Sequence, residues 1–145
     1  MATLKVVLDR IKKLDVHRIV KKTIGETRDI LIDQNREQMM QGIRADGSII
    51  SPPYTYFTRL KKESRGFDSD KVNLYDSGDF QEEIFVDIGS DELEFDSMDN
   101  KSEELQRKYG NKILGLTDDS VKEYIDEAFP VFKRSIEDIT KLEME

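Results

Sequence analysis

An alternating stretch near the middle of the chain most strongly constrains the fold. Within Ile84–Ile88, apolar residues occupy every second position, and residues 89–91 then interrupt the pattern before Leu93 and Phe95 resume it. A period of two indicates a strand with one wet face, and a short break that contains glycine joins two such strands into a hairpin. Because an isolated hairpin is only marginally stable in water, other elements must cover its apolar face.

Helical patterns on the N-terminal side are one candidate for that cover. Apolar residues recur at three- and four-residue steps from Leu4 to Leu14, and a longer pattern runs from Val16 to Met39, with Asp15 placed to cap it. The last part of this pattern, residues 33–42, is rich in amides and poorly apolar on every face. We therefore expect it to project from the body or to pack against something outside this chain.

The segment between these helices and the hairpin is dominated by turn signals. Asp46-Gly47 predicts a turn, and Pro52-Pro53 forces an extended path. The aromatic cluster Tyr54, Tyr56 and Phe57 follows, in a stretch that fits either a short helix or a docked loop. The last residues before the hairpin are too short and turn-rich for a helix or strand, so we expect a tight turn there.

Two more helices are expected after the hairpin. The first covers residues 102–109, with Ser102 as its cap and Gly110 as its end. Thr117 is placed to cap the second, whose first turn is acidic, as the helix dipole favours. Pro130 lies inside the apolar stripe of this last helix and should kink it.

These elements predict an α+β fold in one domain, residues 1–145. Long N-terminal helices and a C-terminal helix would pack on a small antiparallel β-sheet built around the hairpin, which would be clamped between them. The regions are a helical N-terminal part (1–43), a proline-containing loop part (44–70), the β-hairpin part (71–97) and a C-terminal helical part (98–145). A chain of 145 residues suits one domain, since domains of roughly 100–200 residues are usual.

Composition excludes several classes of function. The net charge is −8 and the lysines and arginines are scattered, which argues against direct or sequence-specific nucleic-acid binding. The chain has no cysteine, so disulfides, thiolate chemistry and cysteine-based zinc sites are excluded. No apolar run approaches the roughly 20 residues that span a membrane, and no signal peptide is evident. A soluble protein made in a cytoplasm is expected.

Catalytic chemistry finds little support in the sequence. His17 is the only histidine, and a surface or half-buried role suits it. Ser77 lies in Asp-Ser-Gly-Asp, which resembles a serine-protease motif only by its turn-forming composition. Residues 68–70 begin like a calcium loop, but Val72 and Asn73 then occupy its fifth and sixth positions. We therefore predict no catalytic, cofactor-binding or metal-binding residues, and no enzyme activity.

Acidic side chains crowd the hairpin and the turn before it. They fit a solvated face that discourages aggregation, or a surface that meets a basic partner. The Lys/Arg-rich stretch Lys5–Lys22 could supply that partner surface on another copy. Together with the aromatic cluster, the candidate interaction residues are Asp79, Glu82, Glu83, Asp87, Asp91, Glu94, Tyr54, Tyr56 and Phe57.

A series of short motifs follows the N-terminal helices in a fixed order. Its residues are Asp46, Gly47, Pro53, Tyr54, Thr58, Lys61 or Lys62, Leu74, Ser77, Gly78, Phe80, Ile84, Tyr109, Gly110, Ile113, Leu114, Gly115, Leu116 and Thr117. This order resembles the phage virion-morphogenesis family, the tail-completion and head–tail connector (neck) proteins. In that family a helical N-terminus leads to a "D-G…P-Y/L…T…K" segment, an "L…[TS]-G-x-[LF]…S/I" turn, and a closing aromatic-Gly pair with "F-L-G-L-[ST]". The likeness covers roughly residues 30–130 and lacks the tryptophan of many members and the Arg-Pro pair that often precedes the closing motif.

The resemblance implies a structural protein without enzyme activity or cofactor. Members form homo-oligomeric rings at the neck or tail end, contact other virion proteins, and are assembled into the virion in the bacterial host cytoplasm. Two other hypotheses remain open. One is an acidic binding module, an inhibitor or DNA mimic that occupies a basic site. The other is an enzyme that uses the carboxylate-rich hairpin with a divalent metal.

Overall fold

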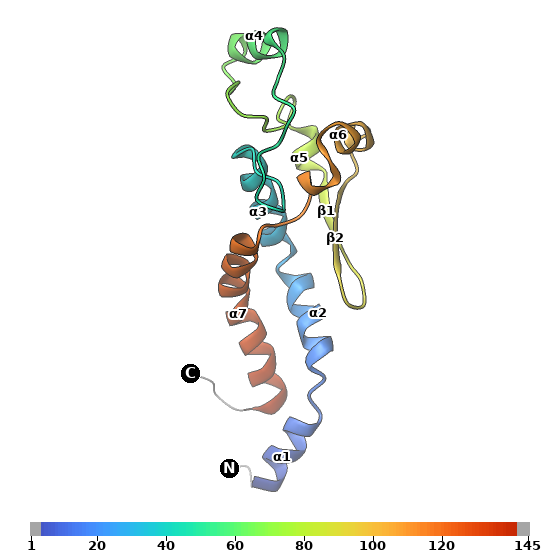
Figure 1. The fold of residues 1–145 in the computed structure, drawn as a ribbon. Coiled ribbons are helices and arrows are strands. Elements are labelled where there is room, and N and C mark those ends of the chain that lie inside the picture. Colours follow the sequence, from blue (N-terminus) through green and yellow to red (C-terminus); the bar gives the residue numbers. More distant parts are fainter. Residues whose placement is uncertain (1–3, 142–145) are drawn as a thin grey trace.

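The structure, a computed structural model, describes residues 4–141 (Figure 1). It is elongated: α4 lies at one end, α1 at the other, and α7 runs beside α2 (Figure 1). Helices dominate, and the described residues contain one antiparallel pair of strands, which confirms the predicted α+β class. The elements are α1 Leu4–Lys12, α2 Val16–Glu26, α3 Arg28–Met40, α4 Tyr56–Ser64, α5 Asp79–Glu82, β1 Ile84–Ile88, β2 Leu93–Ser97, α6 Ser102–Tyr109, the 3-10 turn η1 Asn111–Ile113 and α7 Asp118–Thr140.

The hairpin forms where the alternation predicts it. Strands β1 and β2 pair antiparallel, with Val86 opposite Phe95 and Ile88 opposite Leu93. Val86 is buried, whereas Asp87, on the other face, is exposed. The segment before β1 differs from the expectation, because its end forms the one-turn helix α5 instead of a turn alone.

The sequence predicts that the hairpin is clamped between the N-terminal helices and α7, but the structure shows a different arrangement. Strand β1 packs on α2 and α3, and these two helices lie between the hairpin and α7 (Figure 1). A shared cluster shows the layering: Leu31 of α3 packs with Val86 of β1 and with Tyr124 and Ala128 of α7. The central helix is therefore α3.

The predicted long second helix is divided at Thr27. Its hydroxyl contacts the carbonyl of Thr23 at 2.7 Å and the hydroxyl of Tyr124 at 2.6 Å. A threonine that bonds its i−4 carbonyl tends to bend a helix, and here the bend separates α2 from α3. Gly25 lies inside α2, two residues before this bend.

The amide-rich end of the second pattern corrects the sequence-based expectation most clearly. It neither projects from the body nor waits for an outside partner, because Asn35 and Gln38 are buried within α3. The Asn35 amide donates to the Ile113 carbonyl at 3.3 Å, and its oxygen accepts from the Gly115 N–H at 3.1 Å. Gln38 likewise donates to the Gly115 carbonyl and accepts from the Thr117 N–H. The amides are buried because each satisfies backbone groups of the segment before α7.

The ends of the helices follow the predicted caps with one exception. Asp15 accepts a hydrogen bond from the Arg18 N–H, and Thr117 accepts one from the Ser120 N–H. At α6 the capping position is Lys101, so the assignment of Ser102 as the cap is wrong. The Ser102 hydroxyl is instead 3.3 Å from a carboxylate oxygen of Asp96. Helix α7 runs from Asp118 to Thr140 through Pro130.

Candidate interaction surfaces

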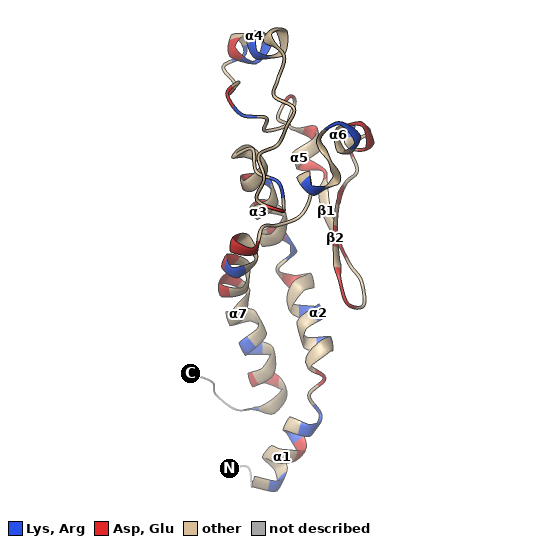
Figure 2. Ribbon diagram, in the orientation of Figure 1, with Lys and Arg blue, Asp and Glu red and all other residues tan. Residues whose placement is uncertain are grey.

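Three parts of the molecule organise its surface. The central body comprises α3, α5, the hairpin, α6 and η1. The arm comprises residues 51–70 with α4, so the predicted loop part also contains a helix. The helical stem comprises α1, α2 and α7. Figure 2 shows basic residues spread along α1, α2 and α4, and acidic residues around the hairpin turn and the start of α7.

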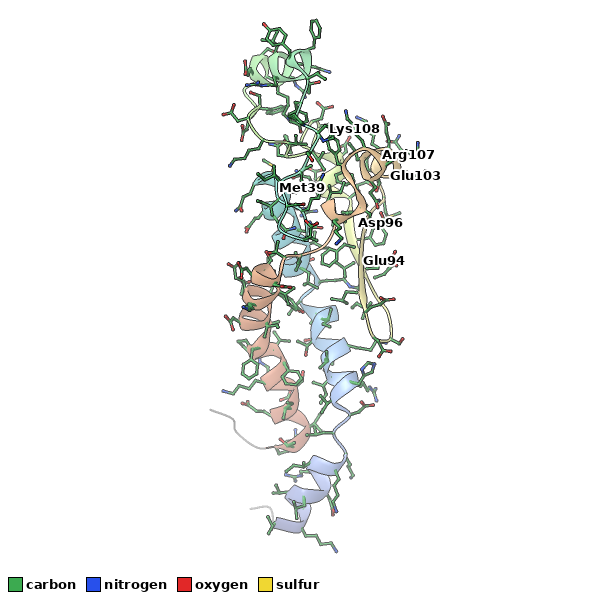
Figure 3. All side chains as sticks on the ribbon, viewed as in Figure 1. Met39, Glu94, Asp96, Glu103, Arg107 and Lys108 are labelled. Atoms are coloured by element: carbon green, nitrogen blue, oxygen red, sulfur yellow. The ribbon has the colours of Figure 1, made fainter. Side chains whose placement is uncertain are left out.

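The predicted acidic residues are all exposed on the central body. Asp87 and Glu94 lie directly opposite each other on the hairpin. Like charges in that position destabilise a strand pair, so nothing in the fold itself favours them. Figure 3 shows Glu94 on the outer side of the hairpin and Met39 inside the body. The remaining members, Asp79, Glu82, Glu83 and Asp91, border α5 and the hairpin turn.

The hairpin turn lies beside α2 of the same molecule. A shallow hollow there is lined by His17 and Lys21 of α2 and by Asp91 and Glu92 of the turn. Part of the Lys5–Lys22 stretch therefore already faces acidic residues within one copy. A charge-based interface between copies, which the sequence suggests, has to use the remaining bases.

The predicted aromatic residues divide into two groups. Tyr54 is half-buried where the arm meets the central body: its hydroxyl accepts from the Leu74 N–H at 3.0 Å and lies 3.4 Å from Asn73 Oδ1. Burial raises the pKa of the Tyr54 hydroxyl. Tyr56 and Phe57, in contrast, lie exposed on α4, and Phe57 retains 82% of its accessible surface. Only Tyr56 and Phe57 are therefore free to meet a partner.

Leu60 completes an apolar surface on α4 that the sequence prediction did not include. It lies three residues after Phe57 and four after Tyr56, so all three side chains share one face of the helix. Leu60 is exposed as well. We call this surface the α4 tip: Tyr56, Phe57 and Leu60.

A buried lysine fixes the arm to the central body. The Lys62 ammonium donates to Asn73 Oδ1 at 3.2 Å and to the Tyr75 carbonyl, and it lies over the ring of Tyr54. Burial lowers the pKa of the Lys62 ammonium. Arg65 pairs with Asp76 on the outside of the same junction and lowers the pKa of that carboxyl. The junction orients α4, and the sequence holds no signal for it beyond a lysine at a helical position.

The stem leaves much of its apolar surface uncovered. None of the α1 residues is buried, and Leu4 retains 74% of its accessible surface. The stripe predicted on α7 is buried only in part, because Ile125 retains 54% of its surface. The exposed apolar side chains of the stem are Leu4, Val6, Leu8, Ile11, Val16, Val20, Val121, Ile125, Phe129 and Ile139.

Between α2 and α7 this surface forms a groove of about 320 Å³. Its walls are almost entirely apolar. We call it the α2–α7 groove. Its lining residues are Val20, Thr23 and Ile24 of α2 and Tyr124, Ile125, Ala128, Phe129 and Phe132 of α7. The sequence holds a signal for it, because Phe129 follows Ile125 by four residues and so extends the apolar stripe of α7.

Two other kinds of feature, a metal site and a membrane-spanning helix, are absent from the part of the chain that the structure describes. Residues 4–141 contain no group of three or more His, Asp or Glu side chains placed to hold a metal ion. Within the same residues, no helix is long and apolar enough to cross a membrane. Every buried side-chain nitrogen or oxygen among them has a hydrogen-bond partner.

Comparison with known proteins identifies no relative. The chain matches no family model, and no curated protein and no solved structure is significantly similar to it. The likeness to the tail-completion family therefore stays a prediction from the motifs alone.

Proposed function

We propose that this chain is a structural subunit of a phage particle, a tail-completion or neck protein that acts through contacts with copies of itself and with other virion proteins. The uncovered apolar surface of the stem is the observation that carries the proposal. Large apolar surfaces on soluble proteins mark sites of association. Of the sixteen exposed large apolar side chains among the described residues, ten lie on the stem.

The motif order supplies the biological setting of this proposal. It implies assembly in the host cytoplasm and a final place in the virion, without an enzyme activity. Three of the motif residues have structural roles: Gly47 and Gly110 adopt positive φ, and Thr117 caps α7. These positions fix the turns around α3, and a ring subunit would need such turns to hold its stem and arm in a constant relation.

Two measurements test the proposal together. Analytical ultracentrifugation of the purified chain should show a concentration-dependent oligomer or a ring. Deletion of the gene from its phage or prophage should give separate heads and tails in electron micrographs, and the protein supplied in trans should join them. A deletion phage with normal, infectious particles would contradict a neck or tail-completion role.

The like-charge pair on the hairpin favours a second candidate, an acidic binding module. Asp87 and Glu94 face each other on the wet side of the sheet, where the fold gains nothing from them. A basic partner surface would relieve the repulsion. A tight monomer that captures a basic protein, with affinity that falls steeply as salt rises, would favour this function over assembly.

A further inference from the structure

A hollow of about 260 Å³ lies where the arm meets the central body. We call it the junction hollow. A cavity of about 150 Å³ is enough for benzene, whereas pockets for drug-sized ligands begin at about 300 Å³, so this hollow suits a molecule of one or two rings. The apolar and aromatic side chains that line it are Tyr54, Leu74, Tyr75, Phe80, Leu105 and Tyr109.

Lys62 also lines the junction hollow and is a buried cation, because only 6% of its surface is exposed. In the described part of the chain no carboxylate forms an ion pair with its ammonium, and its hydrogen-bond acceptors, Asn73 Oδ1 and the Tyr75 carbonyl, are neutral. Burial lowers the pKa of the ammonium, and the charges of Asp76 and Asp68, which raise it, do not offset that cost. Lysines are almost never fully buried unless they are paired, so an anion bound beside Lys62 would stabilise its charge.

The other charges that line the junction hollow cancel. Two of the bases, Arg65 and Lys101, pair with one acid, Asp76. Lys62 is left as one positive charge in excess, so a ligand with a single negative charge would make the lining neutral. A phosphate group, with about −1.5 to −2 charge at pH 7, would leave an excess of negative charge. The charges that cancel are Lys61, Arg65 and Lys101 against Asp76, Asp79 and Asp99.

We propose that the junction hollow binds a small aromatic carboxylate. The ring packs on the apolar lining, and the carboxylate lies toward Lys62, whose ammonium is in contact with Tyr54 and Tyr75 of the same lining. Hydrogen bonds between an ammonium and a carboxylate are roughly twice as strong as neutral ones. Because the lining comes from both the arm and the central body, the ligand also holds α4 in place. This inference goes beyond the proposed function and does not depend on self-association.

Isothermal titration calorimetry with 2-naphthoate, a two-ring carboxylate, tests the site. We expect a dissociation constant of about 1 mM or below, which the usual binding energy per atom allows for a ligand of this size. The uncharged 2-naphthamide has nearly the same shape and should bind at least about tenfold more weakly. Inorganic phosphate, a charged group without a ring, should also bind more weakly than 2-naphthoate.

Variants of α4 locate the binding. Lys62→Met removes the charge, keeps an apolar side chain, and should weaken 2-naphthoate at least about tenfold while leaving 2-naphthamide within about twofold. Lys61→Met is the matched control, because Lys61 lines the same hollow but is exposed, and it should change 2-naphthoate binding less than about threefold. Thr58→Trp puts a bulky side chain at the lining and should weaken both ligands. Circular dichroism shows whether each variant is folded, and Thr58→Trp still tests the site if Lys62→Met is not.

Four results would overturn the inference. The first is an unmodified chain that does not bind 2-naphthoate at about 10 mM, tenfold above the expected constant. The second is equal affinity for 2-naphthoate and 2-naphthamide, and the third is 2-naphthoate binding that Lys62→Met or Thr58→Trp leaves unchanged. The fourth is phosphate binding as tight as that of 2-naphthoate, which would mean an adventitious ion only. None of these results bears on the proposed function, which ultracentrifugation and gene deletion test separately.

Discussion

The central body and the helical stem differ in which side chains they bury. The body buries polar side chains and gives each one a partner: Asn35 is 0% exposed, and both ends of its amide bond the backbone. The stem does the reverse, because α1 leaves its apolar stripe in solvent and α7 buries only part of its own. The difference teaches that the body is complete as one chain, whereas the stem leaves an apolar surface that the proposed association would cover.

The largest expected effect contrasts two apolar residues, one from each region. Leu31 is buried at the centre of the molecule, so Leu31→Ala should lower the free energy of unfolding by about 2–5 kcal/mol. Leu8 is exposed on α1, so Leu8→Ala should change it by no more than about 0.5 kcal/mol. Urea denaturation at low protein concentration measures both. Equal losses would remove the distinction between body and stem.

The next effect tests the amides of α3. Asn35→Ala leaves the Ile113 carbonyl and the Gly115 N–H without their partner. Each buried unsatisfied group costs about 1–3 kcal/mol, so we expect a loss of about 3 kcal/mol in the free energy of unfolding. Glu37→Ala, at an exposed position of the same helix, is the matched control and should be close to neutral. A neutral Asn35→Ala would show that the body does not depend on its amides.

A smaller effect is expected where the arm joins the body. Arg65 holds the pKa of Asp76 below its ordinary value of 3.8. The ionised carboxylate therefore stabilises the fold above that value, and the contribution disappears as the pH falls through the lower folded pKa. The pair is exposed, so Asp76→Asn should cost less than about 1 kcal/mol at neutral pH and less still in high salt. Unfolding curves at pH 7 and at acid pH check this, and a loss that persists in acid would contradict it.

The smallest effect concerns the hairpin's like-charge pair. Asp87→Lys converts the pair with Glu94 into an opposite-charge pair, so the free energy of unfolding should rise by about 0.2–1 kcal/mol. Reversal of both residues restores a like-charge pair and should cancel the gain. The same double reversal tests the charge-based interface with the Lys5–Lys22 stretch. Assembly that is unchanged by it would count against that interface.

The hairpin and the capped helix starts were predictable, because alternation and capping are local properties of the sequence. The positions of the elements relative to one another were not predictable. A hydrophobicity pattern treats the amides of α3 as polar and therefore predicts that they are exposed. Their burial is favourable only because they bond backbone groups around Gly115. Likewise, an apolar stripe on α1 looks the same whether its cover belongs to the chain or to a neighbour. Among the aromatic candidates, Tyr54 is half-buried and Phe57 is exposed. The sequence does not show this difference, because it depends on the contact of Tyr54 with Leu74, twenty residues later in the chain.

The central claim is the proposal that a second copy covers the apolar surface of the stem. Hydrogen exchange followed by mass spectrometry, at low and high protein concentration, measures this directly for every segment. We expect exchange in α1, α2 and α7 to slow as concentration rises, while exchange in α3 does not depend on concentration. Exchange that is independent of concentration in α1, α2 and α7, in a sample that still forms oligomers, would contradict the claim.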